Sequence, residues 1–202
     1  MKMNEQHAHF QVDGLMELGN LAVNNDNNQE MIAQLGGIAR IVSAMNDHPK
    51  NAYVQEYGCA ALQKLAENDI NPEAIADAKG ITPILSAMKD HSSNANVQHY
   101  GFGALQKLAG NDSNKVVIAD EGGIARIVSA MRTHPYNANV QEHGCGALQK
   151  LAENEINKEK IVYAKGIALL LSAMKTHFSN ATIQYYGVQH FGAWLRIMKT
   201  TV

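Results

Sequence analysis

The chain has 202 residues, and its 17 Lys and Arg residues against 19 Asp and Glu residues give a formal net charge of −2. Hydrophobic residues make up 46% and charged residues 18%, a composition typical of a soluble globular protein. This balance argues against a nucleic-acid or membrane-surface binder, because both need a basic excess, and no apolar run approaches the roughly 18 residues of a membrane span.

The first expected element is a single helix over residues 4–25. Its segments Phe10-Gln11 and Leu18 to Ala22 align with Val54-Gln55 and Leu62 to Ala66, which lie at the end of a longer unit. That unit then recurs every 43 residues, as the methionine of a Ser-Ala-Met sequence shows at Met45, Met88, Met131 and Met174. We therefore divide the single domain 1–202 into the leading helix and repeats at 28–68, 71–111, 114–154 and 157–199.

Each repeat is expected to contain three helices of increasing length. In the second repeat the first is Asn71 to Ala78, with Asn71 as the N-cap and Pro72 at the first helical position, and it ends at Lys79-Gly80. The second runs from Ile81 to about Asp90, and its apolar residues are spaced by three and four. The third runs from Asn94 to about Gly110 with one apolar face.

This pattern resembles the armadillo repeat. The residues that carry the resemblance are the Ala-Lys-Gly-Ile or Asp-Glu-Gly-Gly-Ile joint between the first two helices, the Asn-x-x-Val-Gln opening of the third and its Ala-Leu-x-x-Leu-Ala close. The resemblance implies an all-α, right-handed solenoid superhelix, with a HEAT-like array as the alternative. It also implies a non-enzymatic protein–protein interaction module.

Residues that could carry other chemistry are better explained structurally. A histidine recurs at His48, His91, His134 and His177. Because successive repeats lie roughly 10 Å apart, one histidine per repeat cannot form a shared metal site, and we expect each ring to interact with the last carbonyls of the second helix in its own repeat. Cys59 and Cys145 are expected to be small core residues, which favours a reducing, cytoplasmic location. We expect no catalytic residues, cofactor or metal.

The resemblance implies that the third helices line a concave groove. Peptide-binding members of the family present a Trp and, four residues later, an Asn from successive third helices. The Trp position is occupied here by Met16, Ala60, Gly103, Gly146 and Gln189. The Asn position is occupied by Asn20, Lys64, Lys107, Lys150 and Ala193. Only the first of these helices keeps the amide, and a row of lysines argues against a partner that carries basic signals.

Two further rows share this face by helical spacing. One row consists of Asp13, Tyr57, Tyr100, His143 and Tyr186, and the other of Asn24, Asn68, Asn111, Asn154 and Ile197. Tyrosine is favoured at interfaces, and a lysine in each repeat suits carboxylates or phosphates on an extended segment. The row is similar to the lysine-lined grooves of family members that bind acidic peptides. The predicted function is therefore binding of an extended, acidic peptide, with mere duplication of a solvated lysine as the competing explanation.

A second hypothesis is a structural unit that forms homo-oligomers through the ends of the repeat stack. It rests on the missing first two helices at the start and on Phe191 and Trp194 at the other end. Terminal repeats have a neighbour on one side only, so their outer faces either act as caps or stack on another molecule.

Overall fold

The computed structural model describes residues 2–189, with side chains from residue 8 onward. Its helices are α1 (Lys2–Ala22), α2 (Asp26–Gln34), α3 (Gly37–Asp47), α4 (Ala52–Leu65), α5 (Asn71–Asp77), α6 (Ile81–Asp90), α7 (Ala95–Leu108), α8 (Asp112–Asp120), α9 (Gly123–Thr133), α10 (Ala138–Leu151), α11 (Glu155–Tyr163) and α12 (Gly166–Thr176). Residues 181–189 are helical as well, and no strand occurs within the described part.

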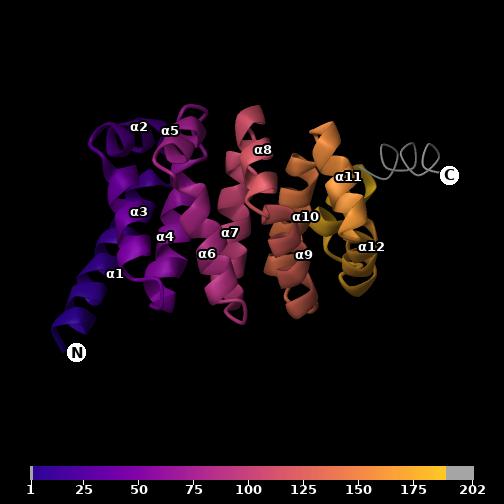
Figure 1. The fold of residues 1–202 in the computed structure, drawn as a ribbon, viewed down its shortest axis with the longest axis horizontal. Coiled ribbons are helices and arrows are strands. Elements are labelled where there is room, and N and C mark those ends of the chain that lie inside the picture. Colours follow the sequence, from indigo (N-terminus) through magenta and orange to yellow (C-terminus); the bar gives the residue numbers. More distant parts are fainter. Residues whose placement is uncertain (1, 190–202) are drawn as a thin grey trace.

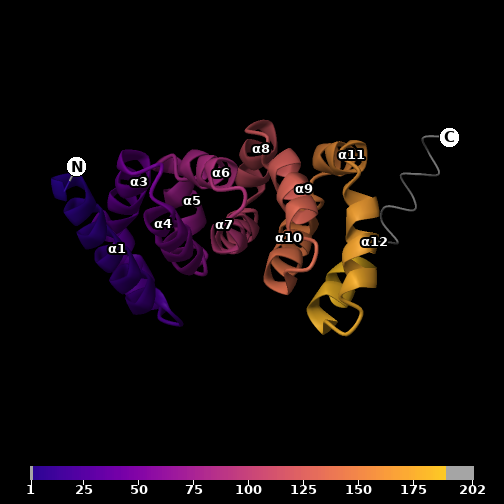
Figure 2. The same ribbon diagram turned by 90° about the horizontal axis from the view of Figure 1, so that it is seen from below.

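The helices form a single row of repeats, which confirms the predicted all-α solenoid. Figure 1 shows the short first helices α2, α5, α8 and α11 side by side along one edge of the row. In Figure 2 the third helices α4, α7 and α10 follow α1 along the inner side of a shallow curve. Among α1 to α12 the most extensive contacts join α1 to α4, α4 to α7 and α7 to α10, so these four helices form one continuous inner layer.

The N-termini of the third helices are fixed by asparagine caps. The side-chain oxygen of Asn51 accepts hydrogen bonds from the backbone N–H groups of Tyr53 and Val54. Asn94 caps α7 with the same two bonds, and Asn137 caps α10 by accepting a hydrogen bond from the N–H of Val140. Each cap satisfies backbone donors that the first turn of a helix leaves unpaired, which is why the predicted Asn-x-x-Val-Gln opening starts a helix.

A recurring glycine in each third helix lets a methionine of the second helix approach closely. A Cβ atom added to Gly101 would lie 2.7 Å from Cγ of Met88, and one added to Gly144 would lie 2.7 Å from Cγ of Met131. Both methionines are fully buried in the continuous core. The glycine therefore costs helix propensity but allows α6 and α9 to pack against α7 and α10.

Buried amide side chains join elements within and between repeats. Gln98 donates hydrogen bonds to the backbone carbonyls of Met88 and His91, at the end of α6. Asn114 donates to the carbonyls of Leu108 and, 42 residues earlier, of Pro72. Equivalent bonds repeat along the chain at Gln55, Gln141, Gln184, Asn71 and Asn157.

These bonds correct two expectations. The carbonyls at the end of the second helix are bonded by the glutamine, so the histidine does not have the predicted role; the ring of His134 instead bonds the carbonyl of Ser92 in the preceding repeat. Asn71 is not an N-cap, because it lies inside α5 and its amide donates to the carbonyls of Leu65 and Gln29. Asn68 accepts the hydrogen bond from the Ile70 N–H at that helix start.

Three further observations bear on the sequence-based hypotheses. Cys59 and Cys145 are buried free thiols in the core, as expected for small core residues. Within residues 2–189, no helix is long and apolar enough to cross a membrane. Phe191 and Trp194, which we predicted as oligomer contacts, lie outside the described residues.

Candidate peptide-binding groove

The inner layer carries the predicted site residues on successive third helices. Tyr57 and Lys64 lie on α4, Tyr100 and Lys107 on α7, and His143 and Lys150 on α10. The tyrosines Tyr57, Tyr100 and Tyr186 are half-buried and pack against the core, so one side of each ring is held in place. Asn20 is exposed on α1.

The three lysines of this face differ in their ion pairs. The Nζ atom of Lys64 lies 3.0 Å from Oε1 of Glu67, and that of Lys150 lies 2.9 Å from Oε1 of Glu153. The residue equivalent to these two acids in the middle repeat is Gly110. Lys107 is exposed, and because this acid is missing it has no ion pair within residues 8–189.

Glu153 is shared between two lysines. The Nζ atom of Lys115, which is almost completely buried, lies 2.9 Å from the second carboxylate oxygen of Glu153. Burial acts to raise the pKa of Glu153, but the hydrogen bonds and charges of Lys115 and Lys150 outweigh it and lower that pKa. Glu153 is thus ionised at neutral pH, and Lys150 is held by a charge that belongs to the fold.

Lys107 and Lys150 line a cavity at the C-terminal ends of the third helices. The cavity has a volume of about 480 Å³, and we call it the lysine pocket. Its lining residues are Ala66, Glu67, Asn68, Asp69, Pro72, Gln106, Lys107, Gly110, Asn111 and Lys150. Four predicted site residues, Lys107, Lys150, Asn68 and Asn111, therefore meet at one place.

The predicted asparagine row has a structural task. The side-chain oxygens of Asn111 and Asn154 cap α8 and α11 by accepting hydrogen bonds from the N–H groups of Asn114 and Asn157. Asn68 is buried, and its amide donates to Glu30 across the repeat boundary over 3.4 Å. These side chains are therefore constrained by the repeat architecture, and they border the groove without being free to reorient.

Glutamines cover the position where the family carries its aromatic row. A Cβ atom added to Gly103 would lie 2.5 Å from the side-chain amide of Gln63, and one added to Gly146 would lie 2.5 Å from that of Gln106. Each glutamine thus lies on the glycine of the next third helix. Sequence reasoning placed these glycines in the groove but missed the glutamines, whose recurrence directly before each lysine is the signal that could have found them.

A pair of histidines joins α7 and α10 at the same face. The rings of His99 and His143 lie 4.4 Å apart, edge to face, and His99 also contacts the ring of Tyr100. Burial lowers the pKa of both histidines, and for His143 the charges of Lys107 and Lys64 lower it further. Both rings are therefore neutral at neutral pH.

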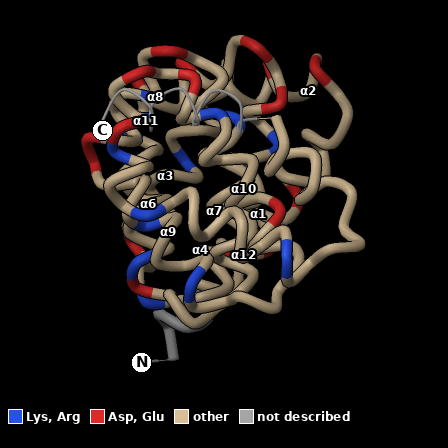
Figure 3. The backbone as a smooth tube through the Cα atoms, turned by 90° about the vertical axis from the view of Figure 1, so that its right-hand side faces the viewer, with Lys and Arg blue, Asp and Glu red and all other residues tan. Residues whose placement is uncertain are grey.

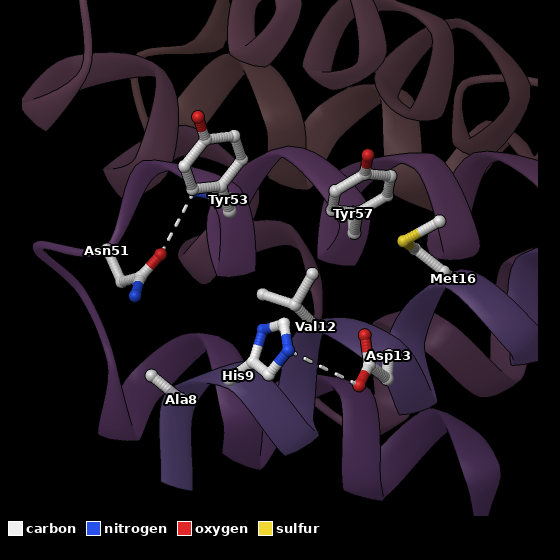
Figure 4. A pocket seen from close by; sticks show the side chains of 8 residues that line it. All are labelled: Ala8, His9, Val12, Asp13, Met16, Asn51, Tyr53 and Tyr57. Atoms are coloured by element: carbon white, nitrogen blue, oxygen red, sulfur yellow. Dashed lines mark hydrogen bonds and ion pairs between the residues drawn. The ribbon is translucent and has the colours of Figure 1, made fainter. Parts of the chain in front are cut away.

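A second cavity of about 410 Å³ lies between α1 and α4 (Figure 4). Its lining residues are Ala8, His9, Val12, Asp13, Met16, Asn51, Tyr53 and Tyr57, and we call it the tyrosine pocket. Figure 4 shows the rings of Tyr53 and Tyr57 on one wall and His9 with Asp13 on the other, with Val12 between the two walls. The tyrosine pocket contains one predicted site residue, Tyr57, and the residue at the family's Trp position in α1, Met16.

The charges on the described surface are mixed. Figure 3, which looks along the row of repeats, shows several acidic segments near α2 and α8, and basic segments together with further acidic ones over the rest of the tube. No group of three His, Cys, Asp or Glu residues within the described part could hold a metal ion.

Comparisons with known proteins agree with this architecture. Residues 7–196 match the family model described as LRRK2 ARM repeat. An engineered protein of known structure is 22% identical, with a TM-score of 0.79 over 89% of this chain and 71% of its own. A second engineered protein is 24% identical, with a TM-score of 0.77 over 88% of this chain and 42% of its own. A designed armadillo repeat protein is 13% identical, with a TM-score of 0.54 over 91% of this chain and 92% of its own. At such identities these likenesses show the fold alone, and no curated protein matches the chain.

Proposed function

Because the chain belongs to the LRRK2-type armadillo (ARM) repeat family, we propose that it is a non-enzymatic module that binds an extended peptide along its inner layer. The fold is commonly a scaffold for protein partners, and the inner layer offers what an extended partner needs. It presents half-buried tyrosine rings, side-chain amides and a lysine from successive helices, at the regular spacing of the repeats.

The observation that supports an acidic partner most directly is the environment of Lys107. Its neighbours in the lysine row are paired with Glu67 and Glu153, so a carboxylate of a partner would have to displace an existing ion pair there. At Lys107 the equivalent acid is absent, because the position is Gly110. We therefore propose that the peptide needs one acidic residue, which docks at Lys107 in the lysine pocket, rather than a run of acids.

The rest of the binding energy would come from the inner layer itself. The rings of Tyr100 and Tyr186 are already held against the core, so they lose little conformational freedom on binding. Gln106 lies over Gly146 and lines the lysine pocket; its amide nitrogen donates one hydrogen bond to the Tyr186 hydroxyl, which leaves the amide oxygen and the second N–H for a peptide backbone. An extended strand has unpaired backbone N–H and C=O groups, which such amides can satisfy.

Selection from a random peptide library tests this function. The immobilised wild type should enrich peptides with one conserved Asp or Glu, and the Lys107→Glu variant should lose that enrichment. Lys89→Glu is the matched control, because Lys89 is an exposed lysine on α6, which is not part of the inner layer. Equal enrichment of acidic peptides by both variants would exclude the proposed role of Lys107.

A second candidate function, association through the stack end, has one specific observation in its favour. Phe10 and Leu21 of α1 are 66% and 50% exposed, whereas the equivalent residues of α4, Val54 and Leu65, are completely buried. An exposed apolar face of this kind is what a neighbouring repeat would cover. Light scattering would support this candidate with a concentration-dependent dimer that the Phe10→Ser, Leu21→Ser double variant lacks, and a constant monomer would exclude it.

A further inference from the structure

We infer that the tyrosine pocket binds a basic side chain of the same peptide whose acidic residue docks at Lys107. The partner would then carry two opposite charges at a fixed separation. This inference rests on the proposed function, because it requires a peptide in the groove. It goes further by adding a second binding site and the spacing between the two.

The walls of the tyrosine pocket suit a cation with an aliphatic stem. Tyr53 and Tyr57 are one helical turn apart on α4, so their rings stand beside each other on one wall. A guanidinium or ammonium group is attracted to the face of such a ring. The lining also contains the apolar residues Ala8, Val12 and Met16, which can pack against the methylene groups of Arg or Lys.

Asp13 provides the opposite charge on the facing wall. Its side chain is 60% exposed, and the ring of His9 lies 3.9 Å away at the pocket rim, where it carries a charge only when protonated. The remaining polar group of the lining, Asn51, is engaged as the cap of α4. Lys50 precedes Asn51 but does not line the pocket. A basic side chain between the two tyrosines would therefore meet a carboxylate that no lysine or arginine of the described chain neutralises.

The acid is peculiar to this end of the groove. In the later repeats the position of Asp13 is occupied by Tyr57, Tyr100, His143 and Tyr186, and the lysine position is occupied in α1 by the uncharged Asn20. The inner layer is thus acidic at α1 and basic at Lys107. A peptide with both charges would be attracted at both ends, and one with two acids would be repelled at α1.

The geometry also sets the separation of the two charges. Tyr57 and Lys64 lie about 10 Å apart along α4, because a helix rises 1.5 Å per residue. The next third helix, which carries Lys107, lies roughly one helix spacing or about 10 Å further along the row. The path between the two pockets is therefore about 15 Å, which an extended chain covers with about five residues.

The test uses peptides that the wild type selects from the random library. Peptides that have an Arg or Lys about five residues before or after the acidic residue are compared with peptides that lack it. Replacing that Arg by norleucine keeps the stem and removes the charge, and it should weaken binding about tenfold. Asp13→Lys should weaken binding of the parent peptide at least as much. This variant should bind more tightly to the peptide in which the Arg is changed to Glu. Tyr53→Ala, at an exposed position, should weaken binding of the parent peptide about threefold or more.

The outcomes separate the two proposals. Asp90→Lys at the end of α6 is the matched charge control and should leave the affinity unchanged. If Lys107→Glu abolishes binding while Asp13→Lys and the norleucine peptide have no effect, the tyrosine pocket does not bind a cation and the proposed function stands. If neither variant affects binding, or if the wild type enriches no peptide, both proposals are wrong. Circular dichroism of each variant shows whether it is folded.

Discussion

The side-chain amide of Gln106 donates a hydrogen bond to the hydroxyl of Tyr186 over 3.0 Å, although the two residues are 80 positions apart. Gln106 lies on α7 and Tyr186 on the helical segment 181–189, and α10 lies between them (Figure 1). The bond is possible because Gly146 of α10 has no side chain, so the amide lies directly on its backbone. A glycine of one repeat thus allows contact between the repeats on either side.

Two glycines of α10 should therefore respond differently to alanine. In Gly146→Ala the new Cβ would lie 2.5 Å from the flexible amide of Gln106, which can swing away. The gain in helix propensity, about 1 kcal/mol, offsets a lost hydrogen bond of similar size. In Gly144→Ala the new Cβ would lie 2.7 Å from both Cγ and Sδ of the buried Met131. We therefore expect the free energy of unfolding to fall by about 1–3 kcal/mol.

Urea denaturation of both variants and the wild type measures this difference in the free energy of unfolding. The two substitutions are chemically identical and lie two residues apart, so each is the control of the other. Equal destabilisation by Gly144→Ala and Gly146→Ala would contradict the packing described for Met131 and Gln106.

The joint between the first and second helices gives a second prediction. Lys79 has a positive φ of 60°, whereas the first and third repeats have glycine at this position, with φ of 79° at Gly36 and 82° at Gly122. Lys79→Gly should therefore raise the free energy of unfolding by up to about 1 kcal/mol, because a side chain is strained in the left-handed region.

The neighbouring Gly80 should respond in the opposite sense. A Cβ atom there would lie 2.7 Å from Cγ2 of the buried Ile75 and 3.0 Å from its carbonyl oxygen, so Gly80→Ala should destabilise the protein. Thermal melts of both variants check the pair. A lower melting temperature for Lys79→Gly would show that the strain at this joint has been compensated elsewhere.

The fold could be predicted from the sequence because the same signals occur four times. The N-caps such as Asn94, the apolar faces and the glycine joints are local features, and a constant period leaves little choice of how the helices stack. The bonds of the buried amides could not be predicted, since Asn114 and Pro72 meet only after the repeats have stacked. The histidine was given the role that Gln98 performs, because the partner of its ring, Pro49 in the case of His91, lies in the preceding repeat.

The candidate site was predicted less completely than the fold. Helical spacing correctly places Lys64, Lys107 and Lys150 on the third helices, but spacing alone does not show which of them is paired. The difference comes from Gly110, where the first and third repeats have Glu67 and Glu153. The tyrosine pocket was missed because it needs α1 and α4 together, and Asp13 was considered only as an exception within a row.

The buried thiols give a third prediction. Burial raises the pKa of both Cys59 and Cys145 to about 12, with a smaller contribution from the carboxylates of Glu56 and Glu142. At about pH 8 only about one thiol in ten thousand would be ionised, so the native protein should react very slowly with a disulfide reagent such as dithionitrobenzoate. Both thiols should react at once in denaturant. Rapid labelling of either cysteine in the native state would show that the core opens there.

The histidine pair gives a fourth prediction. Burial holds the pKa of His99 and of His143 below the value of about 6.5 that the unfolded chain has. Between the two values the unfolded state binds more protons, so this contribution to stability is complete above about pH 6.5 and is lost as the pH falls. The double variant His99→Gln, His143→Gln should have a flatter profile of melting temperature against pH between about 5.5 and 7. An unchanged profile would mean that neither ring loses stability by protonation.

The central claim, that Lys107 binds an acidic residue of an extended peptide, is tested most directly by a charge exchange. The affinities of the wild type and Lys107→Glu are measured for one selected peptide and for the same peptide with its Asp or Glu changed to Lys. We expect each single change to weaken binding about tenfold or more, and the two changes together to restore most of the loss, because the ion pair is re-formed with reversed charges. Losses that simply add would contradict the claim.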